Sequence, residues 1–249
     1  MKIILGLVRF GSRLLEWLAL ALALLLALWG GYSLWCEGQV ARGAYLTGEV
    51  LRCKPTEEDP ENPTLADLQA INPDVVGWLT VPDTHIDYPV VQGEDDMEYV
   101  NRNVEGEYSL SGAIFLSCLN ASDFSDGYNL VYGHHMDSGG MFGDVTRFTE
   151  ADYFAAHPTG VLYRPGQTWD IHFFACVQTD AADPVLYYLR RAADRSALLE
   201  RVEALAVQQN GGPGQAPVIA LSTCTDALTN GRVVLLGWLQ ARENEKEVL

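Results

Sequence analysis

The chain has 249 residues, of which 48% are hydrophobic, and a formal net charge of −17. Such an acidic chain is unsuited to bind nucleic acid, because the phosphates require a basic protein face. It is equally unsuited to lie flat on an anionic membrane surface. With one long apolar segment set aside, about 190 residues remain, which suits one globular domain with a sizeable core.

The N-terminal part of the chain predicts a membrane anchor. Residues 1–13 hold three basic side chains, and residues 14–36 include an uncharged run from Trp17 to Trp35 that is long enough to span a hydrocarbon core. The positive-inside rule then places the N-terminus in the cytoplasm and the bulk of the chain outside. A cleaved signal peptide is the alternative, but no Ala-x-Ala site follows, which favours an uncleaved single-pass anchor in the cell membrane.

Charge changes sharply after this anchor. The first 36 residues have three basic and one acidic side chain, a balance of +2, so the rest of the chain carries −19. Residues 37–63 are predicted to form a juxtamembrane helix, from Gln39 to Arg52, followed by an acidic, proline-rich spacer. Thr64 is predicted to cap a short helix that ends at Ile71.

Residues 64–242 are predicted to form the globular domain, with a C-terminal tail at residues 243–249. Short β-like runs recur there between Gly, Pro, Asn and Asp, which favours a barrel or a sandwich. The predicted strands are Ile86–Gln92, Gly112–Leu116, Tyr128–Tyr132, Trp169–Thr179, Pro217–Thr223 and Arg232–Gln240. One helical pattern, from about Pro184 to Gln208, is expected to pack a single face on the core.

Cys224 and Arg232 are the first candidates for chemistry. Cys224 follows an apolar run, and Arg232 opens the next one after a polar loop, so a thiol and a fixed cation are expected at the same end of two neighbouring strands. A thiolate is the nucleophilic form of cysteine, and nearby positive charge favours it. Most single cysteines are buried core residues, so this interpretation requires a partner base.

Five histidines are available as that base. His85 and His157 lie in turn or loop contexts, and His172 alternates within a predicted strand. His134 and His135 follow the end of a strand, in a glycine-rich loop, where residues are often placed for chemistry. A solvated turn histidine is the alternative for this position.

The cysteine count predicts neither a disulfide framework nor a metal site. Five cysteines is an odd number, and a pair such as Cys118 and Cys176 could be oxidised outside the cell, although spacing cannot establish connectivity. Cys224 has to stay free if it is the nucleophile. No Cys-x-x-Cys or His-x-x-x-His spacing occurs, so neither a metal nor another cofactor is expected.

These residues belong to an ordered set of motifs that spans about residues 65–239. The set consists of Asn72–Leu79, Ile86–Gln92, Gly112–Leu116, Tyr132-Gly133-His134 with Met141-Phe142-Gly143, Leu221-Ser222-Thr223-Cys224, and Arg232. In this order the motifs resemble the sortases, the cysteine transpeptidases of Gram-positive surfaces, and class B best of all. Two positions depart from the family pattern: Ala220 stands where Thr is usual, and Cys118 where an acidic residue is more usual.

The resemblance implies a mainly β fold with helices (α+β). It would be a sortase-like eight-stranded β-barrel with N-terminal helices and a long helix between strands six and seven, preceded by one transmembrane helix. It also implies His134, rather than His135, as the base, because the family's histidine directly follows Tyr-Gly. Cys224 would be the nucleophile and Arg232 the oxyanion clamp, with Thr225, Asp226, Ser222 and Thr223 as candidate supporting residues.

The implied reaction is cleavage of a C-terminal sorting signal after Thr, through a thioacyl intermediate. The partners would be the sorting-signal peptide of a secreted surface protein and an amine, either of the cell-wall precursor or of a pilin lysine. A Cys-His peptidase that uses water as the acceptor, and a non-catalytic binding module on the same scaffold, are the competing hypotheses.

Overall fold

The computed structural model describes residues 2–56, 61–188, 194–225 and 230–242, with all their side chains except those of residues 2–9 and 39–42. The chain divides into two compact units, Met1–Arg42 and Gly43–Leu249. The second unit begins at Gly43, and the globular domain predicted from residue 64 lies within it.

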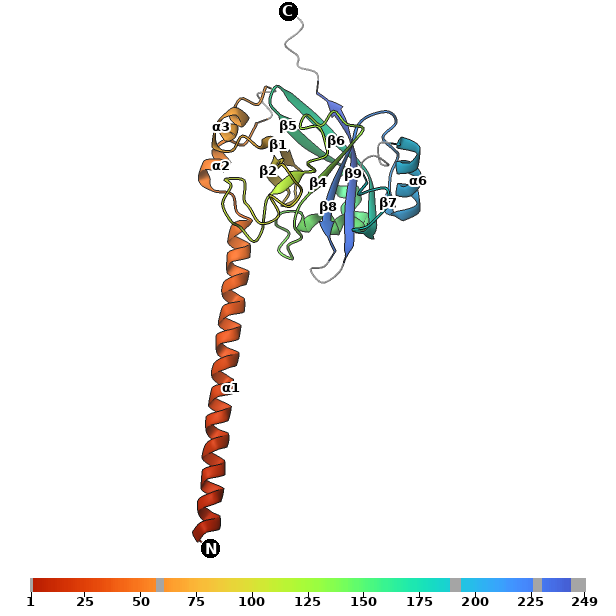
Figure 1. Ribbon diagram of the computed structural model, residues 1–249. Coiled ribbons are helices and arrows are strands. Elements are labelled where there is room, and N and C mark those ends of the chain that lie inside the picture. The colour runs from red at the N-terminus through yellow and green to blue at the C-terminus, as the bar shows by residue number, and fades with distance from the viewer. Residues whose placement is uncertain (1, 57–60, 189–193, 226–229, 243–249) are drawn as a thin grey trace, which may run out of the picture. The chain divides into compact units, whose positions relative to one another are not determined.

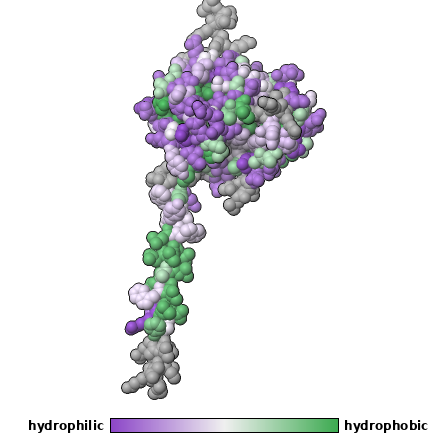
Figure 2. Space-filling view, viewed as in Figure 1, coloured by the Kyte–Doolittle hydropathy of each residue, from purple (hydrophilic) through white to green (hydrophobic). Residues whose placement is uncertain are grey.

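The first unit is a single helix. Helix α1, Lys2–Gly43, runs through the predicted anchor without a break. Within it, Phe10–Gly38 is long and apolar enough to cross a membrane, and its large side chains, such as Leu18 and Trp29, are exposed. Figure 2 shows these apolar side chains around α1, whereas the visible face of the second unit is mostly hydrophilic.

The second unit consists mainly of strands, with short helices (Figure 1). The helices are α2 Gly48–Arg52, α3 Thr64–Ile71, the 3₁₀ helix η1 Gly143–Thr149, α4 Ala151–Ala156 and α6 Arg195–Leu205. The strands are β1 Val75–Thr80, β2 Asp87–Val91, β3 Ile114–Leu116, β4 Tyr128–Tyr132, β5 Thr159–Arg164, β6 Gln167–Asp180, β7 Ala206–Gln209, β8 Val218–Cys224 and β9 Gly231–Ala241.

Eight of these strands close into a barrel. Their order is β5-β1-β2-β3-β4-β8-β9-β6, and a further pairing of β6 with β5 completes the circle. Strand β7 adds to the free part of β6 as a ninth strand. The predicted eight-stranded barrel is thus confirmed, and closure leaves few exposed strand edges.

Apolar side chains fill the barrel and attach the helices to it. The interior cluster includes Leu79, Ile114, Val131, Leu221 and Leu235, all almost completely buried. A second cluster joins α2 and α3 to β1, and a third joins α6 to β6, β8 and β9. In Figure 1, α2 and α3 lie on one side of the barrel and α6 on the other.

Three predicted helix boundaries were wrong. The helix expected over Gln39–Arg52 is two helices, because α1 ends at Gly43 and Thr47 caps α2 by accepting a hydrogen bond from the Val50 N–H. Thr64 is the first residue of α3 rather than its cap, which is at Pro63.

The third error concerns the helix between β6 and β7. Its position is as expected, but α6 begins only at Arg195, where Asp194 caps it, and residues 206–208 belong to β7. Turns occupy residues 181–187 instead, because the Asp183 carboxylate accepts hydrogen bonds from the N–H groups of Val185 and Leu186. Such local side-chain bonds compete with helix formation.

Candidate active site

Three adjacent strands, β4, β8 and β9, bring the predicted residues to one end of the barrel. Cys224 is paired directly with Arg232 across β8 and β9. Tyr132, the last residue of β4, is paired with Ser222, and the Gly133 N–H donates to the Ser222 carbonyl oxygen at 3.1 Å. His134 therefore leaves β4 beside the end of the strand that carries the thiol.

The turn that positions His134 requires a glycine. A Cβ atom on Gly133 would lie 2.5 Å from Cδ1 of Ile114 and 2.6 Å from Cγ of Phe142, both of which belong to the packed core. Beyond the turn, the loop folds back on itself, since the Phe142 N–H donates to the His134 carbonyl oxygen at 3.0 Å. The main chain on both sides of His134 is thus held by packing and hydrogen bonds.

The imidazole of His134 contacts the main chain of a distant loop. Its Nε2 atom lies 2.7 Å from the Val100 carbonyl oxygen. A carbonyl oxygen can only accept, so Nε2 carries a proton and Nδ1 is the basic nitrogen of the neutral ring. Gly112, at φ +59°, allows this arrangement, because a Cβ there would lie 2.5 Å from the same carbonyl oxygen.

Cys224 is a half-buried free thiol. The other four cysteines, the pair Cys118 and Cys176 included, are also free. Burial raises the pKa of Cys176 to about 12, so that thiol is inert at neutral pH. In the described part of the chain, no hydrogen bond joins Cys224 to His134, so the two must approach for a proton to pass between them.

Arg232 extends from the same strand pair. Its Nη1 donates to the Gly231 carbonyl oxygen at 3.0 Å, and the Thr225 N–H donates to the same oxygen at 3.0 Å. The Arg232 guanidinium and the Thr225 N–H, which could act as a second oxyanion donor, are therefore directed at one carbonyl group. A guanidinium has five N–H donors, so Arg232 can keep this bond and still present others to a substrate. The Thr225 N–H can serve an oxyanion only if its bond to Gly231 opens.

The remaining candidate residues differ in position. Ser222 and Cys224 are two residues apart in β8, so their side chains lie on the same face, and that of Thr223 lies on the opposite face. The Thr223 hydroxyl is buried and has no hydrogen-bond partner among the residues that the structure describes. Asp226 lies outside the described residues.

Tyr187, which the sequence did not single out, contacts the strands of both the nucleophile and the base. Its hydroxyl lies 2.7 Å from Oγ of Ser222, and its ring stacks on Tyr132, with centroids 6.4 Å apart. Burial raises the pKa of Tyr187 to about 12, despite opposing effects of Ser222 and Arg232. The sequence pattern placed this residue in the predicted helix at about Pro184–Gln208 and so indicated no separate role for it. The apolar and aromatic run at residues 185–188 is the sequence feature that could have indicated it.

The other four histidines have partners of their own. A ring nitrogen lies 3.2 Å from a carboxylate oxygen of Asp137 in His135, 2.8 Å from one of Asp144 in His85, and 2.8 Å from the Tyr153 carbonyl oxygen in His157. The ring of His172 stacks on Trp238, with centroids 4.0 Å apart. His134 is the first histidine after β4, which ends at Tyr132. Its selection over His135 as the base stays a prediction.

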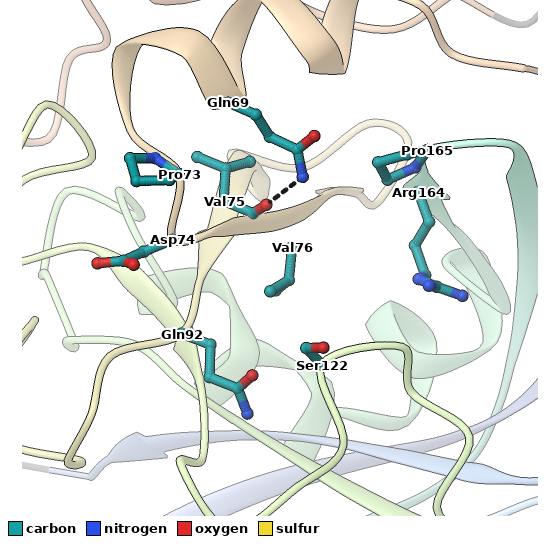
Figure 3. Close-up of a pocket in the computed structure, with 9 residues that line it drawn as sticks. All are labelled: Gln69, Pro73, Asp74, Val75, Val76, Gln92, Ser122, Arg164 and Pro165. Atoms are coloured by element: carbon teal, nitrogen blue, oxygen red, sulfur yellow. Dashed lines mark hydrogen bonds between the residues drawn. The ribbon is translucent and has the colours of Figure 1, made fainter.

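A pocket of about 320 Å³ lies elsewhere on the barrel (Figure 3). Its lining comes from Gln69, Pro73, Asp74, Val75, Val76, Gln92, Ser122, Arg164 and Pro165. None of these residues belongs to β4, β8 or β9. In Figure 3, Gln69 donates across the pocket wall to the Val75 carbonyl oxygen, at 2.8 Å. Over the described ranges of the chain, no group of three or more metal-ligating side chains occurs.

A thiol, an imidazole and a guanidinium at one barrel end can together carry out acyl transfer. The thiol supplies a nucleophile, the imidazole can take and return a proton, and the guanidinium can stabilise a developing oxyanion. This is the chemistry of a covalent thioacyl intermediate.

Comparison with known proteins gives relatives of one kind, although no family model matches the chain. The chain is 35% identical over 184 residues to Sortase B of Listeria monocytogenes, covering 70% of this chain and 73% of that protein. Spy0129, a Streptococcus pyogenes class B sortase involved in pilus biogenesis, is 41% identical with a TM-score of 0.66, over 71% of this chain and 97% of that one. A Staphylococcus aureus sortase B–substrate complex, 23% identical with a TM-score of 0.68 over 75% and 88% of the chains, has the same fold.

Proposed function

The chain belongs to the class B sortases, and from this premise we propose that it cleaves a C-terminal sorting signal after Thr and transfers the protein to an amine. The observation that carries the proposal is the cross-strand pairing of Cys224 with Arg232, next to the turn that holds His134. Family membership supports a cysteine transpeptidase, and this pairing supports Cys224 as its nucleophile and Arg232 as its cation.

In the first half-reaction, the Cys224 thiolate attacks the carbonyl carbon of the scissile bond. A carbon–sulfur bond forms, and the carbonyl electrons move to oxygen, where Arg232 stabilises the charge. Collapse of this intermediate breaks the carbon–nitrogen bond, and His134 gives a proton to the leaving amine. Because Nε2 of His134 is bonded to the Val100 carbonyl, this proton is carried on Nδ1.

In the second half-reaction, an acceptor amine attacks the thioacyl carbon. A new amide bond forms, the carbon–sulfur bond breaks, and His134 takes the proton that the amine loses. The acceptor we propose is an amine of the cell-wall precursor. A pilin lysine is the second candidate, and the 41% identity to a class B sortase involved in pilus biogenesis favours its inclusion.

We also propose that Phe10–Gly38 is an uncleaved anchor, with the N-terminus cytoplasmic and the second unit outside the cell. The basic residues before the apolar stretch support this orientation. Tethering at the membrane would raise the effective concentration of a membrane-bound substrate and of lipid-linked acceptors. Protease added to intact cells should digest the second unit, and an N-terminal sequence that begins at residue 1 would exclude cleavage.

The decisive experiment follows product partitioning in the full-length protein in detergent. A fluorogenic sorting-signal peptide is incubated with no amine, with triglycine and with a lysine-containing peptide, and Cys224→Ala is the control. Transfer predicts an amide product that grows with amine concentration, and mass spectrometry should find a thioacyl adduct on Cys224. If the amount and kind of product do not change when either amine is added, the reaction is hydrolysis. If the wild type and Cys224→Ala both bind the peptide without turnover, the protein is a binding module.

A further inference from the structure

A buried carboxylate, that of Asp183, is one of the groups that attach residues 181–188, which follow β6, to the barrel. The side chain of Asp183 is completely buried, and its Oδ1 atom accepts from the N–H groups of Val185 and Leu186, both at 2.9 Å. Its Oδ2 atom accepts from the Thr179 hydroxyl at 2.9 Å and from Arg201 Nε at 2.9 Å and Nη2 at 2.7 Å. One side chain thereby joins strand β6, the loop and helix α6.

Both ends of this set of bonds lie next to the active site. Thr179, which donates to Asp183, is the cross-strand partner of Arg232. Four residues beyond Asp183, Tyr187 is bonded to Ser222, on the face of β8 that also carries Cys224. The turn that Asp183 imposes therefore determines where Tyr187 reaches the nucleophile's strand.

The ionised form of Asp183 is the one that these bonds favour. Burial alone would raise its pKa, but the Arg201 guanidinium, the two N–H groups and the Thr179 hydroxyl hold the pKa below its usual value. Removing one partner of such a buried pair leaves the other without compensation, so the loss of either Asp183 or Arg201 is expected to disturb these bonds.

We propose that Asp183, held by Arg201, is a positioning residue that fixes Tyr187 beside Cys224 and so shapes the surface that receives the sorting-signal peptide. This inference rests on the proposed transpeptidase function and extends it to peptide recognition. Asp183 itself does not touch the reacting atoms. Its loss should therefore weaken peptide binding more than it slows the chemical step.

The test compares Asp183→Asn and Arg201→Gln with a matched control, Asp194→Asn, in the full-length protein. Asp194 lies at the other end of the same loop, is exposed, and caps α6 through the N–H groups of Ser196 and Ala197. Asn is an equally good cap, so the control removes a charge from the loop without disturbing Tyr187. Thermal melting checks that each variant is folded.

We expect KM for the peptide to rise roughly tenfold in Asp183→Asn and Arg201→Gln, the effect of losing one charge-assisted hydrogen bond, with kcat changed much less. Arg201→Lys should recover part of the loss, and Asp194→Asn should match the wild type. A fall in kcat at unchanged KM, or an equal effect in the control, would overturn the proposal.

A second readout needs no turnover. Hydrogen exchange of the Val185 and Leu186 amides should be faster in Asp183→Asn, while the rate at which iodoacetamide alkylates Cys224 stays the same. Unchanged exchange would show that Asp183 does not hold the loop, whatever the enzyme's reaction. If the wild type transfers no peptide but exchange still responds, the transpeptidase proposal fails while the structural part of this one stands.

Discussion

Cys224 and Arg232 are direct cross-strand partners in β8 and β9, so their side chains leave the sheet on the same face. Because of this pairing, Arg232 has a defined position beside Cys224, which an arbitrary surface cation would not have. Its Nη1 is already bonded to the Gly231 carbonyl, which orients the guanidinium before any substrate arrives. An oxyanion donor that is oriented in advance needs no reorganisation during the reaction.

Replacing Arg232 should therefore affect the chemical step. We expect Arg232→Ala to lower kcat by about 10²–10³-fold, the usual effect of removing an oxyanion donor. Arg232→Lys should recover only part of this, because an ammonium lacks the planar fork of donors. Steady-state kinetics with the fluorogenic peptide gives the numbers, and a lysine variant with full activity would contradict the geometric role.

The bond from His134 to Val100 predicts which ring nitrogen is basic. In ¹⁵N-histidine NMR spectra above the imidazole pKa, Nε2 of His134 should be protonated and Nδ1 unprotonated. His134→Ala should lower kcat by about 10²–10⁴-fold, as expected for a lost general acid and base. His135→Ala is the control and should retain activity. The opposite tautomer would mean that Val100 does not orient the ring.

Thiol labelling should distinguish the cysteines without any substrate. Burial raises the pKa of Cys176 to about 12, and burial together with nearby carboxylates raises the pKa of Cys53 and of Cys118. At pH 7, iodoacetamide should therefore modify Cys224 well before these three. Peptide mapping by mass spectrometry measures the order, and equal labelling of Cys176 in the folded protein would contradict it.

A single methyl group should disturb the turn before His134. The Cβ of Gly133→Ala would meet Ile114 and Phe142 at 2.5–2.6 Å, so we expect a loss of roughly 1–3 kcal/mol in the free energy of unfolding. Gly127→Ala is the matched control, because no atom of the described residues lies within 4 Å of its Cβ position. Denaturant unfolding of both variants tests the difference, and equal stabilities would argue against close packing at the turn.

Asp183 predicts a pH-dependent contribution to stability. Its folded pKa is below the usual value, so its contribution is present above the unfolded pKa of about 4 and is lost as the pH falls through the folded pKa. The difference in melting temperature between the wild type and Asp183→Asn should be constant near neutrality and shrink below about pH 4. A difference that persists unchanged in acid would mean that the carboxylate charge does not matter.

Local patterns predicted some elements better than others. Tyr128–Tyr132 and the two strands that carry Cys224 and Arg232 matched because their apolar runs end at clear turn residues. Strands β1, β5 and β7 were not predicted. Strand β5 contains Gly160 and begins directly after Pro158, residues that locally favour a turn. Its pairing with both β1 and β6 stabilises it, and that pairing appears only in the closed barrel.

By itself, the sequence determined the kinds of reactive group, their order and the strand ends that carry them, because these depend on neighbours close along the chain. Only the tertiary structure decided the partners of those groups. His134 meets a carbonyl 34 residues away, and Tyr187 meets Ser222 across 35 residues. Such contacts depend on how the barrel closes and on the turn that Asp183 stabilises. The hydrophobic periodicity of the sequence reports only local secondary structure and predicts neither.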